Sequence, residues 1–242
     1  MAETIVLLHG FSGTHHTWDR VIARLDAERY SPLAPDIRGH GAASDARPIG
    51  FDEVVEDVLA AAPERFVLCG YSMGGRIAQH VALAAPERVS RLVLVATTAG
   101  IADAGERAER RAADEALAER VERGSIEDFV DGWRDQPHFA DDPPWVGADA
   151  RADQRRNDPR ALAAVLRGLG AGVMEPLWDR LGELAMPAVV VVGERDAKFR
   201  ALGERLVATL PDARLEVVPE AGHAVHQEAP EAIAGTLVNG AN

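Results

Sequence analysis

The chain has 242 residues and a net charge of −13, from 26 basic and 39 acidic side chains. This length suits one large domain, or one domain that carries an insert, and a hydrophobic content of 47% excludes global disorder. So acidic a chain is a poor binder of nucleic acids and anionic membranes, and we expect neither as a partner. No apolar run approaches the roughly 20 residues of a membrane-spanning helix, so we expect no membrane span.

The start of the chain and its cysteine content indicate the compartment. The first apolar run, Ile5–Leu8, is short and has no basic region before it, so we interpret it as a strand of the mature protein and not as a signal peptide. Cys69 is the only cysteine, which excludes an internal disulfide and fits a reducing cytosol. We therefore expect a cytoplasmic protein that is a monomer or a small homo-oligomer.

Short runs rich in Val, Leu and Ile predict six strands, at Thr4–Leu8, Ser31–Ala34, Phe66–Cys69, Arg91–Ala96, Ala188–Val192 and Leu215–Val218. Because these runs are apolar without alternation, we expect a sheet that is buried on both faces. Helical patterns follow the first three runs, at Thr17–Ala27, Asp52–Ala62 and Gly74–Ala85. This alternation predicts an α/β fold with a parallel sheet and right-handed crossovers.

The alternation stops between Ala99 and Met186, where the spacing is helical and charged. Helices are predicted at Glu106–Arg123, Ser125–Arg134, Pro159–Gly168 and Glu175–Leu184, and a Pro- and Asp-rich stretch at Gln136–Pro144. The simplest interpretation is a helical cap of residues 99–185, inserted into a core of residues 1–98 and 186–242. Such a cap would cover the carboxyl edge of the sheet, where open α/β sheets bind ligands.

The segment Gly70–Gly74, with the sequence GYSMG, places Ser72 between a predicted strand and a predicted helix. This pattern is typical of a nucleophile elbow, in which the glycines avoid clashes and the hydroxyl projects above the sheet edge. The backbone N–H of Met73 then faces a developing oxyanion. The loop His9–Gly13 follows the first strand, and we expect the N–H of Phe11 to be the second donor.

A nucleophilic serine needs a base and an orienting acid, which follow a nucleophile elbow in the order acid and then histidine. Asp196 lies just past the fifth predicted strand, and His223 lies in the loop after the sixth. We therefore predict a triad of Ser72, Asp196 and His223. Glu194 is an alternative acid that lies closer to the strand end. His226 is an alternative base, for which a packing or capping role is favoured.

The remaining histidines show no metal-ligand spacing such as H-E-x-x-H, so we expect no metal and no cofactor. Four of them are expected at the surface or in loops: His15, His16, His80 and His138. The segment Asp36–Gly41 follows the second strand, and we interpret it as a structural loop at the rim of the site.

The motifs HGFSG, DIRGHG, GYSMGG, GERD and GHAVH resemble, in this order, those of the α/β-hydrolase superfamily. The resemblance covers nearly the whole chain and implies the α/β-hydrolase fold, a mostly parallel sheet flanked by helices, without the two leading antiparallel strands. Three further features resemble the 2-succinyl-6-hydroxy-2,4-cyclohexadiene-1-carboxylate synthase family of menaquinone biosynthesis. They are Arg76 one helical turn after the serine, the sequence GERDAKF, and a cap that carries tryptophan and arginines.

The second resemblance implies a lyase that eliminates pyruvate from an anionic cyclohexene carboxylate. In that reaction His223 takes the proton of Ser72, and Ser72 then acts as the base. Substrate-binding roles are implied for Arg76, Tyr71, Arg110, Trp133, and Arg155 or Arg156. Arginine forms bidentate pairs with carboxylates, which suits a small anionic substrate.

A carboxylesterase or related serine hydrolase that acts through an acyl-enzyme remains an alternative, because it would use the same triad and oxyanion hole. The pocket separates the two functions, since arginines favour the synthase and an apolar lining favours an esterase. A binding protein on an inactive hydrolase scaffold is disfavoured by the intact set of serine, acid and histidine.

Overall fold

The computed structural model describes residues 2–136, 139 and 142–239. Its strands form one sheet in the order β2-β1-β3-β4-β5-β6, in which every neighbouring pair is parallel. They are β1 (Glu3–Leu8), β2 (Tyr30–Leu33), β3 (Phe66–Tyr71), β4 (Val89–Val95), β5 (Ala188–Gly193) and β6 (Ala213–Val218). All six predicted strands are confirmed, and the described part of the sheet is parallel throughout.

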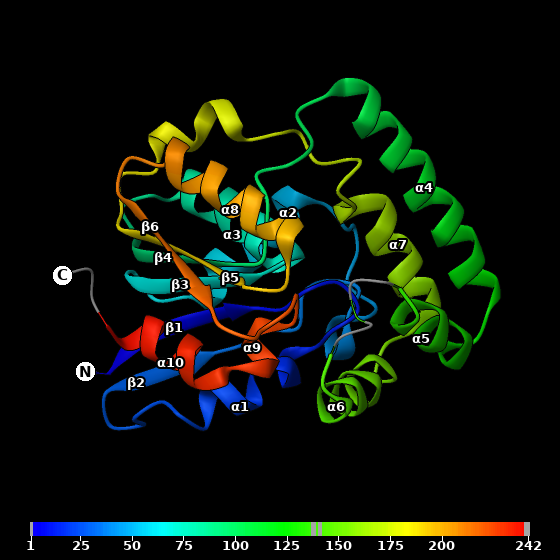
Figure 1. Cartoon of the computed structure of the whole chain (residues 1–242). Coiled ribbons are helices and arrows are strands. Elements are labelled where there is room, and N and C mark those ends of the chain that lie inside the picture. The colour runs from blue at the N-terminus through cyan, green and yellow to red at the C-terminus, as the bar shows by residue number, and fades with distance from the viewer. Residues whose placement is uncertain (1, 137–138, 140–141, 240–242) are drawn as a thin grey trace.

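Helices cover both faces of this sheet (Figure 1). One face carries α2 (Phe51–Ala61), α3 (Met73–Ala84) and α8 (Ala197–Thr209), and the other carries α1 (Asp19–Ile22), α9 (Val225–Glu228) and α10 (Pro230–Val238). Successive strand residues point to opposite faces, so Leu68 joins the core beneath α3 and Val67 joins the core beneath α10. Burial on both sides explains the apolar runs of the inner strands β1, β3, β4 and β5, whereas the edge strands β2 and β6 are only partly buried.

The helix predicted over Thr17–Ala27 is shorter in the structure. The chain forms a 3₁₀ turn, η1 (His15–Trp18), then the single turn α1, and a second short 3₁₀ turn, η2 (Gly41–Ala43), lies at the rim. The Asp26 carboxylate accepts a hydrogen bond from the Glu28 N–H at 2.9 Å, and the Asp26 carbonyl accepts from the Arg29 N–H at 3.0 Å. Asp26 therefore closes a turn, which replaces the last part of the predicted helix.

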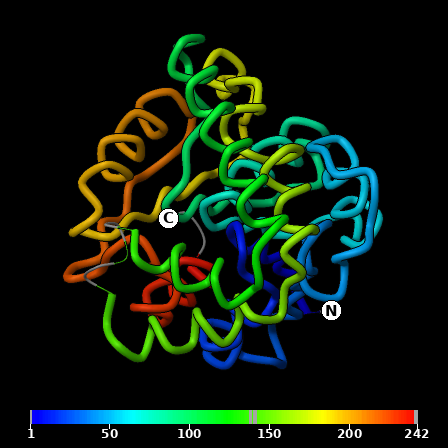
Figure 2. Tube along the Cα trace, turned by 90° about the vertical axis from the view of Figure 1, so that its right-hand side faces the viewer, coloured from blue at the N-terminus to red at the C-terminus, as the bar shows by residue number. Residues whose placement is uncertain are grey.

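Between β4 and β5 the chain forms α4 (Ala104–Arg123), α5 (Ile126–Arg134), α6 (Pro144–Gln154), α7 (Pro159–Leu169) and the 3₁₀ helix η4 (Trp178–Glu183). The helices α4 to α7 lie together beside the carboxyl ends of the strands (Figure 1), and they lie in front of the sheet in Figure 2. The helix α6 was not predicted from the sequence, because its start is rich in proline. Pro144 occupies the first turn, where the missing N–H leaves no helical hydrogen bond unmade.

The order of the strands indicates where along the sheet a ligand would bind. Since β2 and β3 lie on opposite sides of β1, the order of the chain reverses between β1 and β3, and ligands bind outside the carboxyl ends of the strands at such a point. The loop after β1 and the turn after β3 both lie there. No helix in the described part of the chain is long and apolar enough to cross a membrane.

Candidate active site

Ser72 occupies the turn between β3 and α3, as the elbow pattern predicts. Its φ is +51°, in the left-handed region that costs a non-glycine residue about 1–3 kcal/mol. Close packing enforces this turn: a Cβ at Gly70 would lie 2.2 Å from the Gly74 carbonyl oxygen, and one at Gly74 would lie 2.2 Å from the Leu8 carbonyl oxygen. The Thr97 hydroxyl donates a 2.7 Å hydrogen bond to the Ser72 carbonyl. The serine is therefore held in a fixed, strained backbone above the sheet.

Asp196 and His223 meet from two different loops. The Asp196 Oδ2 lies 2.7 Å from the His223 Nδ1, and both side chains are at least nine-tenths buried. The second carboxylate oxygen of Asp196 accepts from the Phe199 N–H at 3.2 Å and so caps α8. The Phe199 ring lies 4.5 Å from the imidazole of His223. The carboxylate thus fixes both the start of α8 and the Nδ1 edge of the histidine.

Glu228 holds the loop that carries the histidine. Its buried carboxylate accepts from the Gly222 N–H at 2.9 Å and lies 2.6 Å from the Arg195 Nη2. A Cβ at Gly193 would lie 2.1 Å from the Gly222 carbonyl oxygen, so the loops after β5 and β6 pack backbone to backbone. This contact brings the acid-bearing loop and the histidine-bearing loop together.

The two alternative side chains lie elsewhere. Glu194 is exposed, and its carboxylate accepts from the Glu220 N–H at 3.0 Å. His226 is buried, with its Nε2 2.7 Å from the Thr17 Oγ1 and its ring centroid 3.9 Å from that of Tyr71. Burial, together with the nearby histidine charge, lowers the pKa of His226 to about 3. The carboxylate and imidazole that meet are the pair preferred in the sequence analysis.

A cavity of about 760 Å³ opens between the carboxyl edge of the sheet and α4, α5 and α7. Most of the predicted site residues line it, namely Ser72, Asp196, His223, Phe11, Met73, Tyr71, Arg76, Arg110 and Trp133. Asp114, Arg120 and Lys198 also line the cavity, although none of them was predicted as a site residue from the sequence. Once Arg110 is assigned to the site, helical spacing places Asp114, Leu117 and Val121 on the same face of α4, so Asp114 could have been found from Arg110. Arg120 does not belong to this series.

Arg76 is the buried cation of this cavity, one helical turn after the serine. Its Nη1 donates a 2.8 Å hydrogen bond to the carbonyl of Leu169, at the end of α7, and its guanidinium carbon lies 5.9 Å from the centre of the Phe51 ring. Burial and the Arg110 charge lower the pKa of Arg76 to about 10, and Asp114 opposes them. Arg76 therefore stays cationic at neutral pH, and it forms an ion pair with no carboxylate of the described residues.

Arg110 differs from Arg76 in having a carboxylate partner. Its Nε lies 2.7 Å from the Asp114 Oδ1, one turn further along α4. The Asp114 carboxylate is buried and accepts from the Gly172 N–H at 3.3 Å, whereas the Arg110 side chain is 43% exposed. Asp114 thus anchors Arg110 at the side of the cavity while its guanidinium keeps contact with solvent.

Aromatic side chains form the wall of the cavity next to the predicted oxyanion loop. The ring of Trp133 lies 5.0 Å from that of Phe11 and stacks at 5.7 Å on that of Phe129. Phe139 lies 6.3 Å from Trp133 and 6.4 Å from His223. The cavity therefore combines a flat apolar wall with the cationic groups on α3, α4 and α8.

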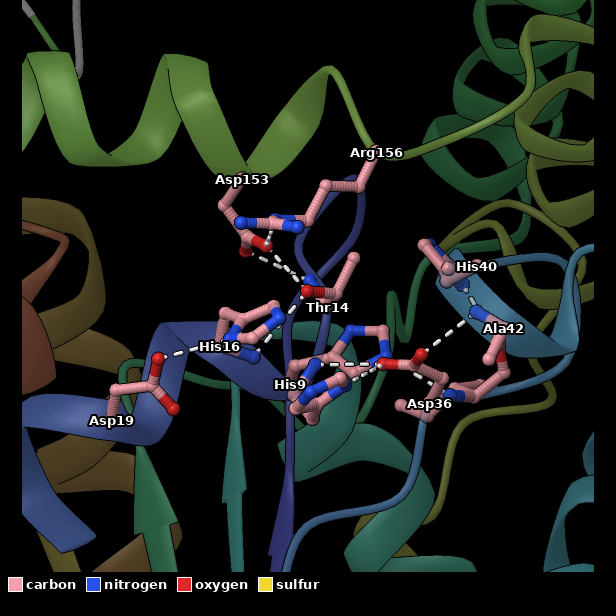
Figure 3. Close-up of polar contacts among 12 residues, drawn as sticks. His9, Thr14, His16, Asp19, Asp36, His40, Ala42, Asp153 and Arg156 are labelled. Carbon is pink, nitrogen blue, oxygen red and sulfur yellow. Dashed lines mark hydrogen bonds and ion pairs between the residues drawn. The ribbon is translucent and has the colours of Figure 1, made fainter.

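Arg155 and Arg156 are not brought to the cavity. Both are exposed in the turn after α6, and the Arg156 Nε lies 3.9 Å from the Asp153 Oδ1 (Figure 3). The physical reason is α6 itself, whose unpredicted last turn directs these two side chains to the exterior. His80 is also misplaced by the sequence analysis, since it packs on α3 at 4.4 Å from the Phe51 ring. His138 lies outside the described residues, among which no cluster of three or more His, Cys, Asp and Glu side chains could hold a metal ion.

The model of the alpha/beta hydrolase family matches residues 5–236. The chain belongs to the alpha/beta hydrolase family. This alpha/beta hydrolase is 36% identical over 241 residues to a protein of Serratia proteamaculans named 2-succinyl-6-hydroxy-2,4-cyclohexadiene-1-carboxylate synthase. The alignment covers 97% of this chain and 91% of the relative. A protein of Salmonella typhimurium with the same name is 33% identical, covering 97% of this chain and 92% of the relative. Among solved structures, MenH from S. aureus has a TM-score of 0.91 and 28% identity, covering 98% of this chain and 92% of that chain.

Proposed function

We propose that this alpha/beta hydrolase is a carbon–oxygen lyase of menaquinone biosynthesis. It would eliminate pyruvate from 2-succinyl-5-enolpyruvyl-6-hydroxy-3-cyclohexene-1-carboxylate and form 2-succinyl-6-hydroxy-2,4-cyclohexadiene-1-carboxylate, the compound for which its relatives are named. One observation carries the proposal. The buried guanidinium of Arg76, without a carboxylate partner in the described residues, lines the same cavity as Ser72 and the Asp196–His223 pair.

The proposed chemistry begins at the serine. With its Nδ1 held by Asp196, His223 accepts the hydroxyl proton of Ser72 through Nε2, and the carboxylate stabilises the imidazolium that forms. The serine oxygen then removes a proton from the substrate ring, and the C–O bond to the enolpyruvyl group breaks as the ring diene forms. The N–H groups of Phe11 and Met73 stabilise the negative charge that develops. The C–O bond breaks with its electron pair on the leaving oxygen, which gives the enolate of pyruvate. This enolate takes up the proton held by the His223 imidazolium, so pyruvate leaves and the neutral histidine is restored.

The charges in the cavity suit a substrate with several carboxylates. Arg76, Arg110, Arg120 and Lys198 supply four cationic side chains along its length. The carboxylates that also line it already accept hydrogen bonds from other groups, since Asp114 pairs with Arg110 and Asp128 accepts from the Ser125 hydroxyl at 2.7 Å. The net charge of the whole chain is −13, so this local set of cations must overcome the repulsion of an anion by the rest of the molecule.

Residues 99–185 would act as the cap over this chemistry, and residues 1–98 and 186–242 as the core that holds the triad. The position of α4, α5 and α7 along one wall of the cavity supports this division. The proposed enzyme takes a small anionic carboxylate as its partner, needs no metal or cofactor for the proton transfers, and would work in the cytoplasm.

An assay of pyruvate release tests the proposal, with lactate dehydrogenase and NADH reporting the product. Wild-type protein should release pyruvate from the cyclohexene precursor, and Ser72→Ala should abolish the release. p-Nitrophenyl acetate is the matched control for the esterase alternative, because an acyl-enzyme mechanism needs no buried cation. Efficient cleavage of this ester without pyruvate release would replace the lyase by a carboxylesterase.

A further inference from the structure

The loop of residues 10–14, which carries the predicted oxyanion donor Phe11, has a strained backbone at Ser12 and buries the side chains of Ser12 and Thr14. Ser12 is buried and has a φ of +65°, although it is not glycine. Such a residue costs about 1–3 kcal/mol and persists only where its surroundings hold it. Phe11 lines the cavity, and its N–H donates to no backbone carbonyl of the described residues.

The side chains that hold this loop come from the end of α6 and the turn after it. Asp153 accepts from the Thr14 N–H at 2.9 Å and also from the Thr14 hydroxyl (Figure 3). Gln154 donates through Nε2 to the Ser12 hydroxyl at 2.9 Å, and Asn157 donates through Nδ2 to the Ser12 carbonyl at 2.7 Å. All three of these side chains are buried, each less than one-tenth exposed. The inserted helical segment therefore holds the loop at two residues, Ser12 and Thr14, through three of its own side chains.

The rim loop completes the enclosure from the other side. His40 is fully buried, and its Nε2 accepts from the Ser12 N–H at 3.3 Å. Burial lowers the pKa of His40 to about 3, which keeps this nitrogen an unprotonated acceptor at neutral pH. Asn157 accepts from the Gly41 N–H at 3.0 Å and so ties the rim loop to the same turn. The N–H, the carbonyl and the hydroxyl of Ser12 are thus all engaged.

We propose that Asp153, Gln154 and Asn157 are positioning residues for the oxyanion hole. The contacts from the end of α6 hold Ser12 in its left-handed conformation, and this conformation aims the N–H of Phe11 at the cavity. The inference rests on the proposed function for the role of Phe11. It goes further in making the inserted helical segment a part of the charge-stabilising machinery, in addition to a wall of the substrate cavity. Donor geometry within a few tenths of an ångström decides how well such a group stabilises a developing charge.

The test compares two Asp→Asn variants on the same helix. Asp153→Asn weakens the hold on Thr14, whereas Asp149→Asn changes an exposed carboxylate that pairs with Arg20 at 2.6 Å. For pyruvate release we expect Asp153→Asn to lower kcat by about 10- to 100-fold, somewhat less than the loss of about 10²–10³ on deleting a whole oxyanion donor. KM should change by less than about twofold, because the interaction is made in the transition state. Asp149→Asn should retain both constants.

A second pair keeps the inference testable if Asp153→Asn does not fold. Thr14→Val removes the hydroxyl that donates to Asp153, and Thr14→Ser retains it. We expect the valine variant to lose kcat and the serine variant to recover it. A purely structural role predicts a different result for Thr14→Val. Either KM rises, because Arg110 and Trp133 move with the loosened helices, or the melting temperature falls while both kinetic constants are unchanged.

The rate of labelling of Ser72 by a fluorophosphonate separates this inference from the proposed function. The reagent needs the serine and the oxyanion donors but not the arginines. If the wild type is labelled but releases no pyruvate, the lyase proposal fails, and a slower labelling of Asp153→Asn than of Asp149→Asn still supports the positioning role. Equal kcat and equal labelling rates for Asp153→Asn and Asp149→Asn overturn the positioning role. A wild type that neither releases pyruvate from the precursor nor reacts with the fluorophosphonate also overturns it.

Discussion

Replacing Arg76 by alanine gives the sharpest test of how the cavity recognises its substrate. The guanidinium has five N–H donors, and in the described part of the chain one hydrogen bond uses them, to the carbonyl of Leu169. The remaining donors lie in a buried site where water competes poorly for them. A substrate carboxylate there would form charge-assisted hydrogen bonds in two parallel contacts.

The size of the effect follows from the energy of such bonds. A hydrogen bond to a charged group contributes about 1.5–3 kcal/mol, and about 1.4 kcal/mol corresponds to a tenfold change. Arg76→Ala should therefore lower kcat/KM for pyruvate release by about 10- to 150-fold, mainly through a higher KM. Arg76→Lys keeps the charge and loses the planar guanidinium, so its kcat/KM should lie between those of the wild type and Arg76→Ala.

The assay needs a control for folding, since the alanine variant also leaves the buried carbonyl of Leu169 without its donor. That loss costs about 1–3 kcal/mol of unfolding free energy, and urea denaturation measures it separately. Turnover of p-nitrophenyl acetate should change little, because this ester carries no carboxylate. An Arg76→Ala protein that remains folded with an unchanged kcat/KM for the anionic substrate would refute the assignment of Arg76 as its binding group.

Three further outcomes are expected. Asp196→Asn should lower kcat about 10⁴-fold by losing the carboxylate that orients the imidazole, whereas Glu194→Gln should leave steady-state kinetics unchanged. Burial lowers the pKa of His226 from 6.5 to about 3, so the unfolded chain binds the extra proton first and the free energy of unfolding falls as the pH drops from about 6.5 towards 3. His226→Phe should therefore reduce the slope of the unfolding free energy against pH in this range by about 1.4 kcal/mol per pH unit, measured by urea titrations. A Cβ at residue 235 would meet no described atom within 4 Å outside its own helix, so Gly235→Ala should raise the unfolding free energy by about 0.5–1 kcal/mol. Gly74→Ala should lower the unfolding free energy by about 3 kcal/mol, because its Cβ would overlap the carbonyl oxygen of Leu8 at the end of β1. Equal effects of the two glycine substitutions on thermal unfolding would contradict this reading of the elbow.

The features that could be predicted from the sequence are those determined locally or by chain order. The inner strands β1, β3, β4 and β5 are buried on both faces and are rich in apolar residues, so they were recognisable. The edge strands β2 and β6 are only partly buried, and their short apolar runs were still sufficient to predict them. The elbow around Ser72 was recognisable because few sequences other than glycine-flanked ones fit between a strand and a helix. Asp196 and His223 were found from their order after the serine, and the structure places them 2.7 Å apart.

What the sequence did not predict depends on contacts between distant segments. The helix α4 is charged around its circumference, so its own residues do not show which side faces the sheet, and Arg120 was overlooked for this reason. Lys198 enters the cavity because α8 begins at the loop of the acid, which only the packed sheet establishes. The start of α6 has the composition of a loop, and Arg155 and Arg156 were misplaced with it.

The two strands that deliver the acid and the histidine, β5 and β6, form one edge of the sheet and come from the last quarter of the chain. During synthesis from the N-terminus, β1 to β4 can pair with one another before either of these strands leaves the ribosome. A nascent polypeptide would then carry its serine on a formed turn with no partner to take the proton. The triad would in this way be complete only after β5 and β6 have been synthesised.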